Sequence, residues 1–251
     1  MSILRVNEIR PASGTTIAIP SNYNLSLGGT ILDASSMMPN PAGNAGKVLV
    51  SNGSTTAWQS VGPVSMQVFE SSTTWIKPSG IKRILVRLVG AGGGGSGHGE
   101  GGGAGGYSER IIDVSAVTSV SVTVGVGGGG TYYANAGGGG SGTSFGAFLS
   151  ASGGNGANTT NQHCGGLPGI GSGGNVNIYG GGGSGHEYYS GPVTGGSFFG
   201  GAAATGHPNG GSFAVNHQYR CAPGAGGSPA YAGSYAGCQG KSGIVVVWEF
   251  R

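Results

Sequence analysis

The sequence has little charge: Asp, Glu, Lys and Arg make up 8% of its 251 residues, and the net charge is +3. Soluble domains typically carry about 25% charged residues. The few cations are scattered and form no basic run, which is the feature that marks nucleic-acid and membrane-surface binders. We therefore expect no nucleic-acid partner.

Two kinds of hydrophobic pattern are also missing. No run of 18 apolar residues occurs, so the sequence predicts no transmembrane helix. No segment repeats apolar residues at helical spacing, so we expect no amphipathic helix. The N-terminal residues turn polar too soon for a secretion signal, which predicts a protein that is made in a cytoplasm.

Metal-binding and redox motifs are absent as well. The three cysteines, Cys164, Cys221 and Cys238, form no CxxC pair. A Cys221–Cys238 bridge would leave one thiol over, and small buried apolar side chains are the alternative. The five histidines fit no metal-ligand spacing. A metal on a threefold axis would need only one histidine from each chain, but we expect neither a metal nor a cofactor.

Catalytic and nucleotide-binding motifs are not found either. Matches to GxGxxG follow from composition alone, and the sequence at 240–242 lacks the first glycine of a phosphate loop and precedes a strand. Sugar cleavage needs two carboxylates across a cleft. Between positions 90 and 243 the acids are Glu100, Glu109, Asp113 and Glu187. Glu109 and Asp113 flank a framing strand, which leaves Glu100 and Glu187 for that task. We expect no enzyme.

What the chain has in excess is glycine: it has 60, and all but eight lie between positions 90 and 243. Such a content is typical of low complexity or disorder, while runs of four glycines break the register of collagen. Against disorder stand two strongly β-forming segments that frame this part, residues 81–89 and 244–250. Phe, Tyr and Trp residues within the framed part also favour an ordered chain.

Ordering so many glycines requires backbone hydrogen bonds, because glycine has no side chain to bury and loses the most conformational freedom on folding. Left-handed extended helices with three residues per turn direct their N–H and C=O groups outward on all sides. Several such helices can pack side by side, because only glycine lets their backbones come that close. A polyglycine II bundle and a set of looser loops both stay open at this stage.

The remaining patterns predict an all-β fold. Residues 47–51 and 55–61 should pair about the Asn52-Gly53 turn, and residues 66–68 and 75–76 should form a further strand pair. Together with the framing strands, alternation at 111–114 and 119–124 predicts a small β-sandwich with large glycine-rich insertions. Weaker alternation predicts two further short strands, at residues 3–9 and 15–19.

We divide the chain into residues 1–40, a shaft hairpin at 41–65 and a glycine-rich β-sandwich at 66–251. The first 65 residues have too few apolar positions for a core of their own. Isolated hairpins are marginal in water, so a chain this thin is expected to associate with copies of itself.

A series of segments follows in fixed order: a strand opening into a glycine run at 75–95, then 105–109, 120–130 and 142–146, and a closing strand at 243–248. This series resembles the glycine-rich, receptor-binding tip domains of phage tail fibres, and residues 46–58 are similar to a hairpin of fibre shafts. The resemblance implies an intertwined homotrimer in the virion that binds a polysaccharide or outer-membrane protein of the bacterial host. By position, residues 1–40 are expected to attach it to a baseplate or other tail protein.

Large side chains of the glycine-rich part come in pairs or beside histidine. Aromatic faces on exposed loops can stack on sugars or grip a membrane protein, or else they can fill gaps between the sandwich and the glycine-rich part. The candidate receptor-binding residues are Tyr132, Tyr133, His163, His186, Tyr188, Tyr189, Phe198, Phe199, His207, His217 and Tyr219. Two alternative functions stay open, a polysaccharide-degrading tail spike and a structural fibre segment that carries a separate adhesin.

Overall fold

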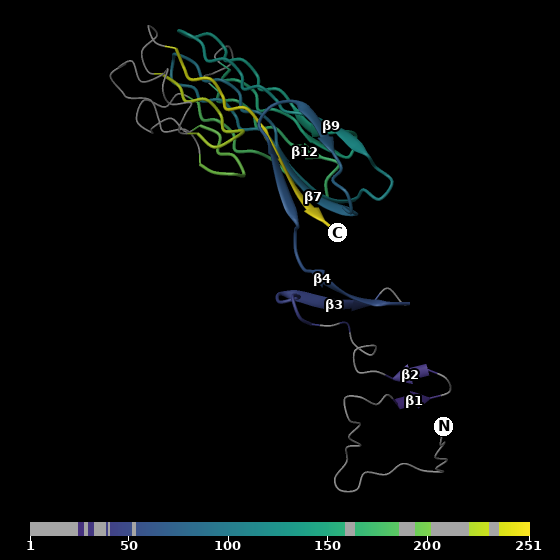
Figure 1. Ribbon diagram of the computed structural model, residues 1–251. Coiled ribbons are helices and arrows are strands. Elements are labelled where there is room, and N and C mark those ends of the chain that lie inside the picture. Colours follow the sequence, from purple (N-terminus) through teal and green to yellow (C-terminus); the bar gives the residue numbers. More distant parts are fainter. Residues whose placement is uncertain are drawn as a thin grey trace, which may run out of the picture. The chain divides into compact units, whose positions relative to one another are not determined.

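The computed structural model describes residues 25–27, 30–32, 39, 41–51, 54–158, 164–185, 194–201, 221–230 and 236–251. Within these residues every regular element is a β-strand, which confirms the all-β prediction (Figure 1). The chain divides into two units, residues 1–62 and residues 63–251. Each is described by itself.

The first unit contains two antiparallel pairs. Strand β1 (Leu25–Leu27) pairs with β2 (Thr30–Leu32), and β3 (Lys47–Ser51) pairs with β4 (Thr56–Ser60) in the predicted shaft hairpin. Every residue of β3 is exposed, and in β4 only Trp58 is half-buried. Hence this hairpin has no core of its own. The strands expected at 3–9 and 15–19 lie outside the described residues.

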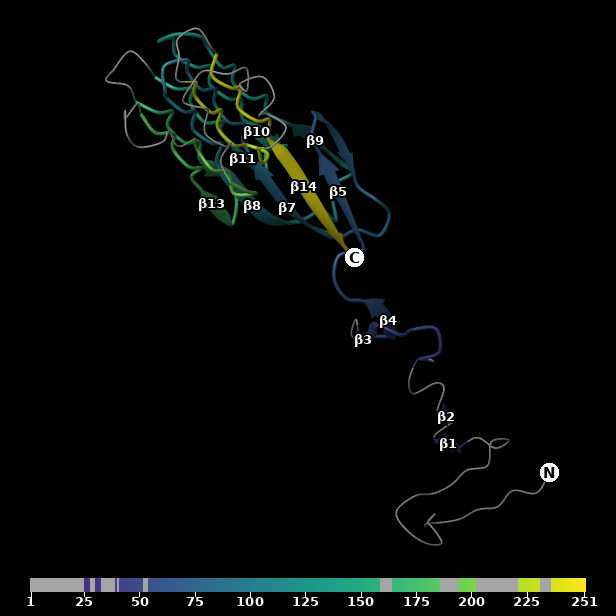
Figure 2. The same cartoon turned by 90° about the vertical axis from the view of Figure 1, so that its left-hand side faces the viewer.

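The second unit is a sandwich of two five-stranded antiparallel sheets. In the long-strand sheet the order is β13-β8-β7-β14-β5, seen from left to right in Figure 2, and in the short-strand sheet it is β12-β11-β10-β9-β6. The strands are β5 (Ser65–Phe69), β6 (Thr73–Ile76), β7 (Arg83–Val89), β8 (Tyr107–Asp113), β9 (Ser119–Thr123), β10 (Thr143–Phe145), β11 (Leu149–Ala151), β12 (Gly171–Ser172), β13 (Val176–Ile178) and β14 (Ile244–Phe250).

The two framing strands are direct neighbours: β14 pairs with β7 along its whole length, from Ile244 opposite Val89 to Phe250 opposite Arg83. Both ends of the glycine-rich part are thus fixed side by side in one sheet. The expected pairing of residues 66–68 with 75–76 is wrong. Strand β5 pairs with β14 and β6 pairs with β9, so these two segments belong to different sheets. A long-range pairing with the closing strand took the place of a local hairpin.

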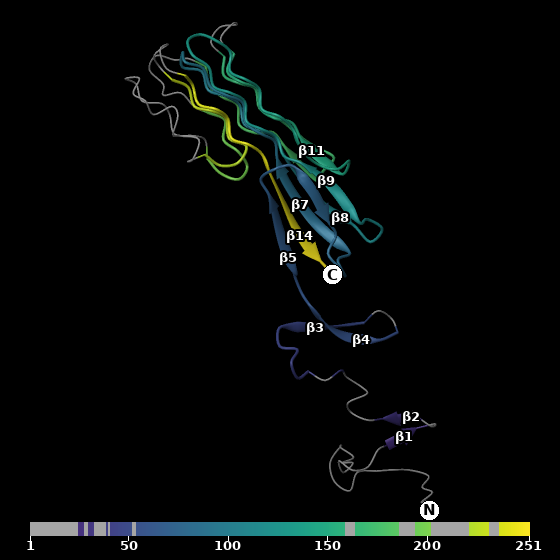
Figure 3. The ribbon, with the colours of Figure 1, turned by 45° about the horizontal axis from the view of Figure 1, so that its top comes forward.

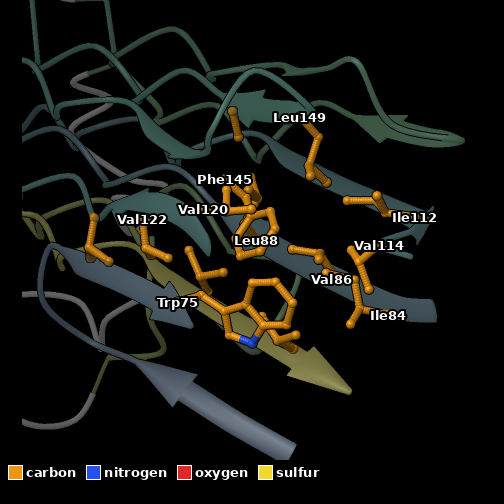
Figure 4. Packing of buried hydrophobic residues seen from close by; sticks show 14 of the residues in the cluster. Trp75, Ile84, Val86, Leu88, Ile112, Val114, Val120, Val122, Phe145 and Leu149 are labelled. Carbon is orange, nitrogen blue, oxygen red and sulfur yellow. The ribbon is translucent and has the colours of Figure 1, made fainter. Parts of the chain in front are cut away.

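The core lies between the sheets and is built from alternate residues of their strands (Figure 4). Ile84, Val86 and Leu88 of β7 are fully buried, and the Trp75 ring lies 5.8 Å from that of Phe145, centroid to centroid. This alternation is what places half of each strand out of water. Fully burying one such side chain stabilises the fold by about 1.5–3 kcal/mol.

One carboxylate lies inside this core. Glu249 of β14 is fully buried and accepts hydrogen bonds from the Trp75 indole N–H at 2.8 Å and from the Gln67 amide at 2.7 Å. The Ser65 hydroxyl donates to it as well. A buried charge is tolerated only when its hydrogen-bonding capacity is used. Glu249 therefore ties β14 to β5 and β6, and with them the two sheets to each other.

Glycine-rich segments leave the strand ends and lie side by side beyond the sheets, as the views in Figures 1 and 3 agree. We call them together the glycine bundle. Among the described residues it has ten segments, namely residues 90–96, 100–106, 124–131, 136–142, 152–158, 164–170, 179–185, 194–200, 222–230 and 236–243.

The segments are joined by backbone hydrogen bonds with a period of three residues. In segment 90–96, amides of one series (Gly90, Gly93, Ser96) donate to segment 100–106, those of the next (Ala91, Gly94) to 136–142, and those of the third (Gly92, Gly95) to 236–243. Carbonyls of the same segment accept from 124–131, 152–158 and 222–230. Segment 90–96 is thereby surrounded by six neighbours. The same holds for segment 100–106, which also bonds to 164–170, 179–185 and 194–200.

Glycine is required in these central segments because backbones touch there. A Cβ on Gly93 would lie 2.1 Å from the carbonyl oxygen of Asn155, and one on Gly102 would lie 2.1 Å from that of Gly93. Real Cβ atoms do not approach backbone so closely. At these positions the absence of a side chain, and not an unusual backbone angle, allows the packing.

Candidate functional site

We call the end of the glycine bundle far from the sheets the distal end, and described residues of several segments are hydrogen-bonded there. The amide of Thr131 donates to Gly95 at 3.1 Å, and that of Ala230 donates to Ser96 at 2.9 Å. Asn158 and Cys164 exchange both of their backbone hydrogen bonds. Residues that are far apart in the sequence therefore meet at this end.

Tyr132 and Tyr133 lie in a turn at the distal end, with exposed fractions of 56% and 61%. The Thr131 hydroxyl donates to the Asn135 carbonyl at 2.7 Å, and the Asn135 amide donates to the Tyr132 carbonyl at 2.9 Å. Tyr133 has a φ of 54°, in the left-handed region that side-chain-bearing residues rarely adopt. Such strain is kept where the surrounding structure fixes it, and it is concentrated at functional sites. The turn holds two large aromatic side chains out in solvent.

Phe198 and Phe199 lie elsewhere. Phe198 stacks on Tyr107, with ring centroids 3.6 Å apart and planes 19° apart, and Phe199 meets the same ring edge-on at 6.0 Å. Tyr107 is the first residue of β8, so this cluster sits at the sheet end of the glycine bundle. The structure does not bring these two candidates together with Tyr132 and Tyr133. Their contacts match the gap-filling alternative from the sequence, although Phe198 is still half-exposed.

The other candidates, namely His163, His186, Tyr188, Tyr189, His207, His217 and Tyr219, lie outside the described residues. For His163, the described residues on either side, Asn158 and Cys164, are paired at the distal end.

The turn between the two central segments, residues 96–100, is a hydrogen-bonded unit that the sequence reasoning did not predict. The Ser96 hydroxyl oxygen accepts the amides of Glu100 at 3.1 Å and His98 at 3.2 Å, and the hydroxyl donates to the Glu100 carboxylate. The His98 ring lies 3.9 Å from the same carboxylate, and its side chain is 45% exposed at the distal end. A Ser with Glu four residues later, around two glycines, is the signal that could have indicated this turn.

Burial of Glu100 bears on the sugar-cleaving alternative. Its side chain is fully inside the glycine bundle, where a polysaccharide cannot reach it, while Glu187 lies outside the described residues. General acid catalysis requires a carboxyl within hydrogen-bond reach of the substrate. Glu100 instead stabilises the 96–100 turn by accepting a hydrogen bond from the Ser96 hydroxyl.

The cysteines differ in their surroundings. Cys238 is buried, Cys221 is half-buried and Cys164 is exposed, and none forms a disulfide. Burial raises the pKa of the Cys238 thiol and of the Cys221 thiol, which keeps both protonated and unreactive. The interpretation of the cysteines as small buried side chains fits Cys238 and is wrong for Cys164.

The described part of the chain holds no cluster of three or more His, Cys, Asp or Glu side chains that could bind a metal ion. Among the same residues no helix is long and apolar enough to cross a membrane.

A sequence model of glycine-rich domains matches residues 67–248. The chain belongs to this glycine-rich domain family. The match covers nearly all of the sandwich and the whole glycine bundle, so the glycine-rich domain is one unit in which the strands and the glycine segments occur together. Comparison with curated proteins gives no match. The resemblance to phage tail fibres stays a prediction.

Proposed function

We propose that the protein is a tail fibre of a bacteriophage virion and that its glycine-rich domain binds a receptor on the surface of the bacterial host. The observation that carries this proposal is the turn at the distal end, where Tyr132 and Tyr133 are exposed on a support almost without side chains. The order of strands and glycine runs that resembles fibre tips supports it as well. No cofactor and no catalytic step are needed.

The support itself is, in this proposal, a polyglycine II bundle. A helix of that kind has three residues per turn, so amides three positions apart point toward the same neighbour. The three-residue period of the hydrogen bonds around segments 90–96 and 100–106 supports this assignment. The two central segments are then enclosed by the other eight.

Such a bundle suits a receptor-binding tip because the residues that stabilise it are not the residues that would recognise the receptor. The hydrogen bonds of the central segments involve backbone atoms, whereas Tyr132 and Tyr133 lie in a turn that Thr131 and Asn135 hold locally. The two tyrosines can therefore change without loss of the scaffold. Tyrosine offers a rigid aromatic face with a polar tip, which suits sugar rings and the rims of outer-membrane proteins.

Oligomerisation is the second part of the proposal: the fibre is a homotrimer whose first 40 residues attach to a baseplate or other tail protein. The exposed side chains of Val48, Leu49 and Val50 in β3 support association of copies, because one hairpin leaves them in water. Three tips on one fibre, and several fibres on one virion, raise avidity well above the affinity of a single tip.

Binding of the purified full-length protein to host cells tests the receptor part. Replacing both Tyr132 and Tyr133 with Ala should weaken binding by about tenfold or more, since exposed aromatics dominate such interfaces. Tyr179→Ala is the matched control, because Tyr179 is 64% exposed but lies next to β13, at the sheet end. It should leave binding unchanged.

Equal binding by the double variant and the wild type would overturn the assignment of the receptor surface. A folded wild-type protein that binds no host cell would favour the structural fibre instead. Release of reducing sugars from purified host polysaccharide would favour the tail spike.

A further inference from the structure

The long-strand sheet has an unusually apolar outer face, by which we mean the side chains that point away from the sandwich core. Its main members are Met66, Val68, Leu85, Ile111, Val176 and Trp248. Four of them form one row across the sheet, because Trp248 lies opposite both Met66 and Leu85, and Leu85 lies opposite Ile111. Ile111 is 64% exposed and Met66 is 56% exposed.

The short-strand sheet shows what a solvated face looks like in the same molecule. In β9 the buried residues are Val120 and Val122, while the exposed ones are Ser119, Ser121 and Thr123. Antiparallel sheets with one face in water usually follow this rule of polar residues outside. The outer face of the long-strand sheet breaks it, and a contiguous apolar patch of this kind marks an interaction site.

Charges on the outer face neutralise one another. Arg87 forms an ion pair with Glu109 in the middle of the face, and its guanidinium lies 5.0 Å over the Trp248 ring. The Tyr107 hydroxyl donates to the same Glu109 at 2.8 Å, and burial together with this hydrogen bond raises the pKa of Tyr107, so that it stays neutral. At the end of the sheet Arg83 lies opposite Asp113.

A face with balanced charge favours an identical face as its partner. Anionic lipid headgroups or nucleic acids would require a surplus of Lys and Arg, which the outer face lacks. Two copies of this face would bury apolar surface without bringing a net charge against a like charge. Its ion pair is already satisfied within one chain, so burying it leaves no charge without a partner.

The link between β4 and β5 is short, so association of the first unit would limit how far apart the outer faces of the copies can lie. Strand β4 ends at Ser60 and the edge strand β5 begins at Ser65. The residues between them can span at most about 18 Å from Cα to Cα when fully extended. If copies associate through residues 1–62, their β5 strands, which carry Met66 and Val68, are held within reach of one another.

We propose that the outer face of the long-strand sheet is an interface between copies of this chain. This inference rests on the oligomeric fibre of the proposed function and names the surface that joins the glycine-rich domains. Association through this face would hold the distal ends of the copies at fixed positions, which avidity for a receptor requires.

Sedimentation of the full-length protein over a range of concentrations tests this interface. Ile111→Glu places a charge on the apolar face and should raise the concentration for half-association by about tenfold or more. Ile76→Glu is the matched control, because Ile76 is 70% exposed on β6 of the other sheet. It should change that concentration by less than about twofold.

A second variant tests whether any loss in Ile111→Glu comes from the interface or from a local disturbance at Ile111. Val68→Glu, on the opposite side of the outer face, should weaken association in the same direction, and circular dichroism should show both variants folded. If the wild type associates and both variants associate equally well, the interface is elsewhere; the oligomeric fibre then stands and this inference falls. If the wild type is monomeric at every concentration, both fall, whereas the host-cell binding of Tyr132 and Tyr133 is tested independently.

Discussion

The sandwich and the glycine bundle of one domain are held together by opposite means. In the sandwich, side chains such as Trp75 and Phe145 fill the space between two sheets, and the backbones stay apart. In the glycine bundle the backbones themselves are in contact, and a Cβ at most central glycines would overlap a carbonyl group. Removing atoms should therefore damage the first region, and adding atoms should damage the second.

The largest effect is expected from adding one methyl group to the glycine bundle. Gly93→Ala would place its Cβ 2.1 Å from the Asn155 carbonyl oxygen, where only backbone could move aside. Because segment 90–96 touches six neighbours, we expect a loss of more than about 4 kcal/mol in the free energy of unfolding. Chemical denaturation of the full-length protein measures it.

Gly129→Ala is the control for this substitution. Gly129 lies in the peripheral segment 124–131, and a Cβ there meets nothing within 4 Å. Its unfolding free energy should change by less than about 0.5 kcal/mol. Equal losses for the two variants would mean that close backbone packing is not what makes glycine necessary.

The next effect comes from removing atoms in the sandwich. Phe145 is fully buried against Trp75, so Phe145→Ala should cost about 3–5 kcal/mol in unfolding free energy through lost burial and a cavity. Phe198→Ala, at a half-exposed ring, should cost about 1 kcal/mol. A Phe145→Ala protein as stable as the wild type would show that the sandwich core does not hold the domain.

A smaller effect is expected at the polar centre of the sandwich. In Glu249→Gln one carboxylate oxygen becomes an NH₂ group, so Trp75 and Gln67 donate to a neutral amide oxygen and the oxygen that accepts from Ser65 is lost. The unfolding free energy should fall by about 1–3 kcal/mol. Glu70→Gln, at an exposed position, is the matched control and should be neutral. If the two variants behave alike in denaturation, the buried carboxylate does not tie the sheets.

The long strands were predictable and the short ones were not. Alternation over seven residues indicated β7 and β14, because a long period-two pattern leaves little ambiguity about a strand. Strands β10 to β13 have three residues or fewer. They were hidden among glycines, since so short a segment shows no period and is fixed by its partners.

In the candidate site, too, local features could be predicted and long-range contacts could not. The exposure of Tyr132 and Tyr133 could be predicted, because two large aromatics between glycine runs stand out and the turn that holds them is local, made by Thr131 and Asn135. Phe198 carried the same signal but stacks on Tyr107 of β8. No local pattern could show that contact, because it depends on how the glycine bundle meets the sheets.

Amide hydrogen exchange across the glycine bundle tests the account most directly. If backbone hydrogen bonds between glycine segments make a rigid support, amides of segments 90–96 and 100–106 should exchange at least about a hundredfold more slowly than those of the turn with Tyr132 and Tyr133. Exchange of the central segments as fast as in an unstructured peptide would contradict it, because no scaffold would then hold the tyrosines in place.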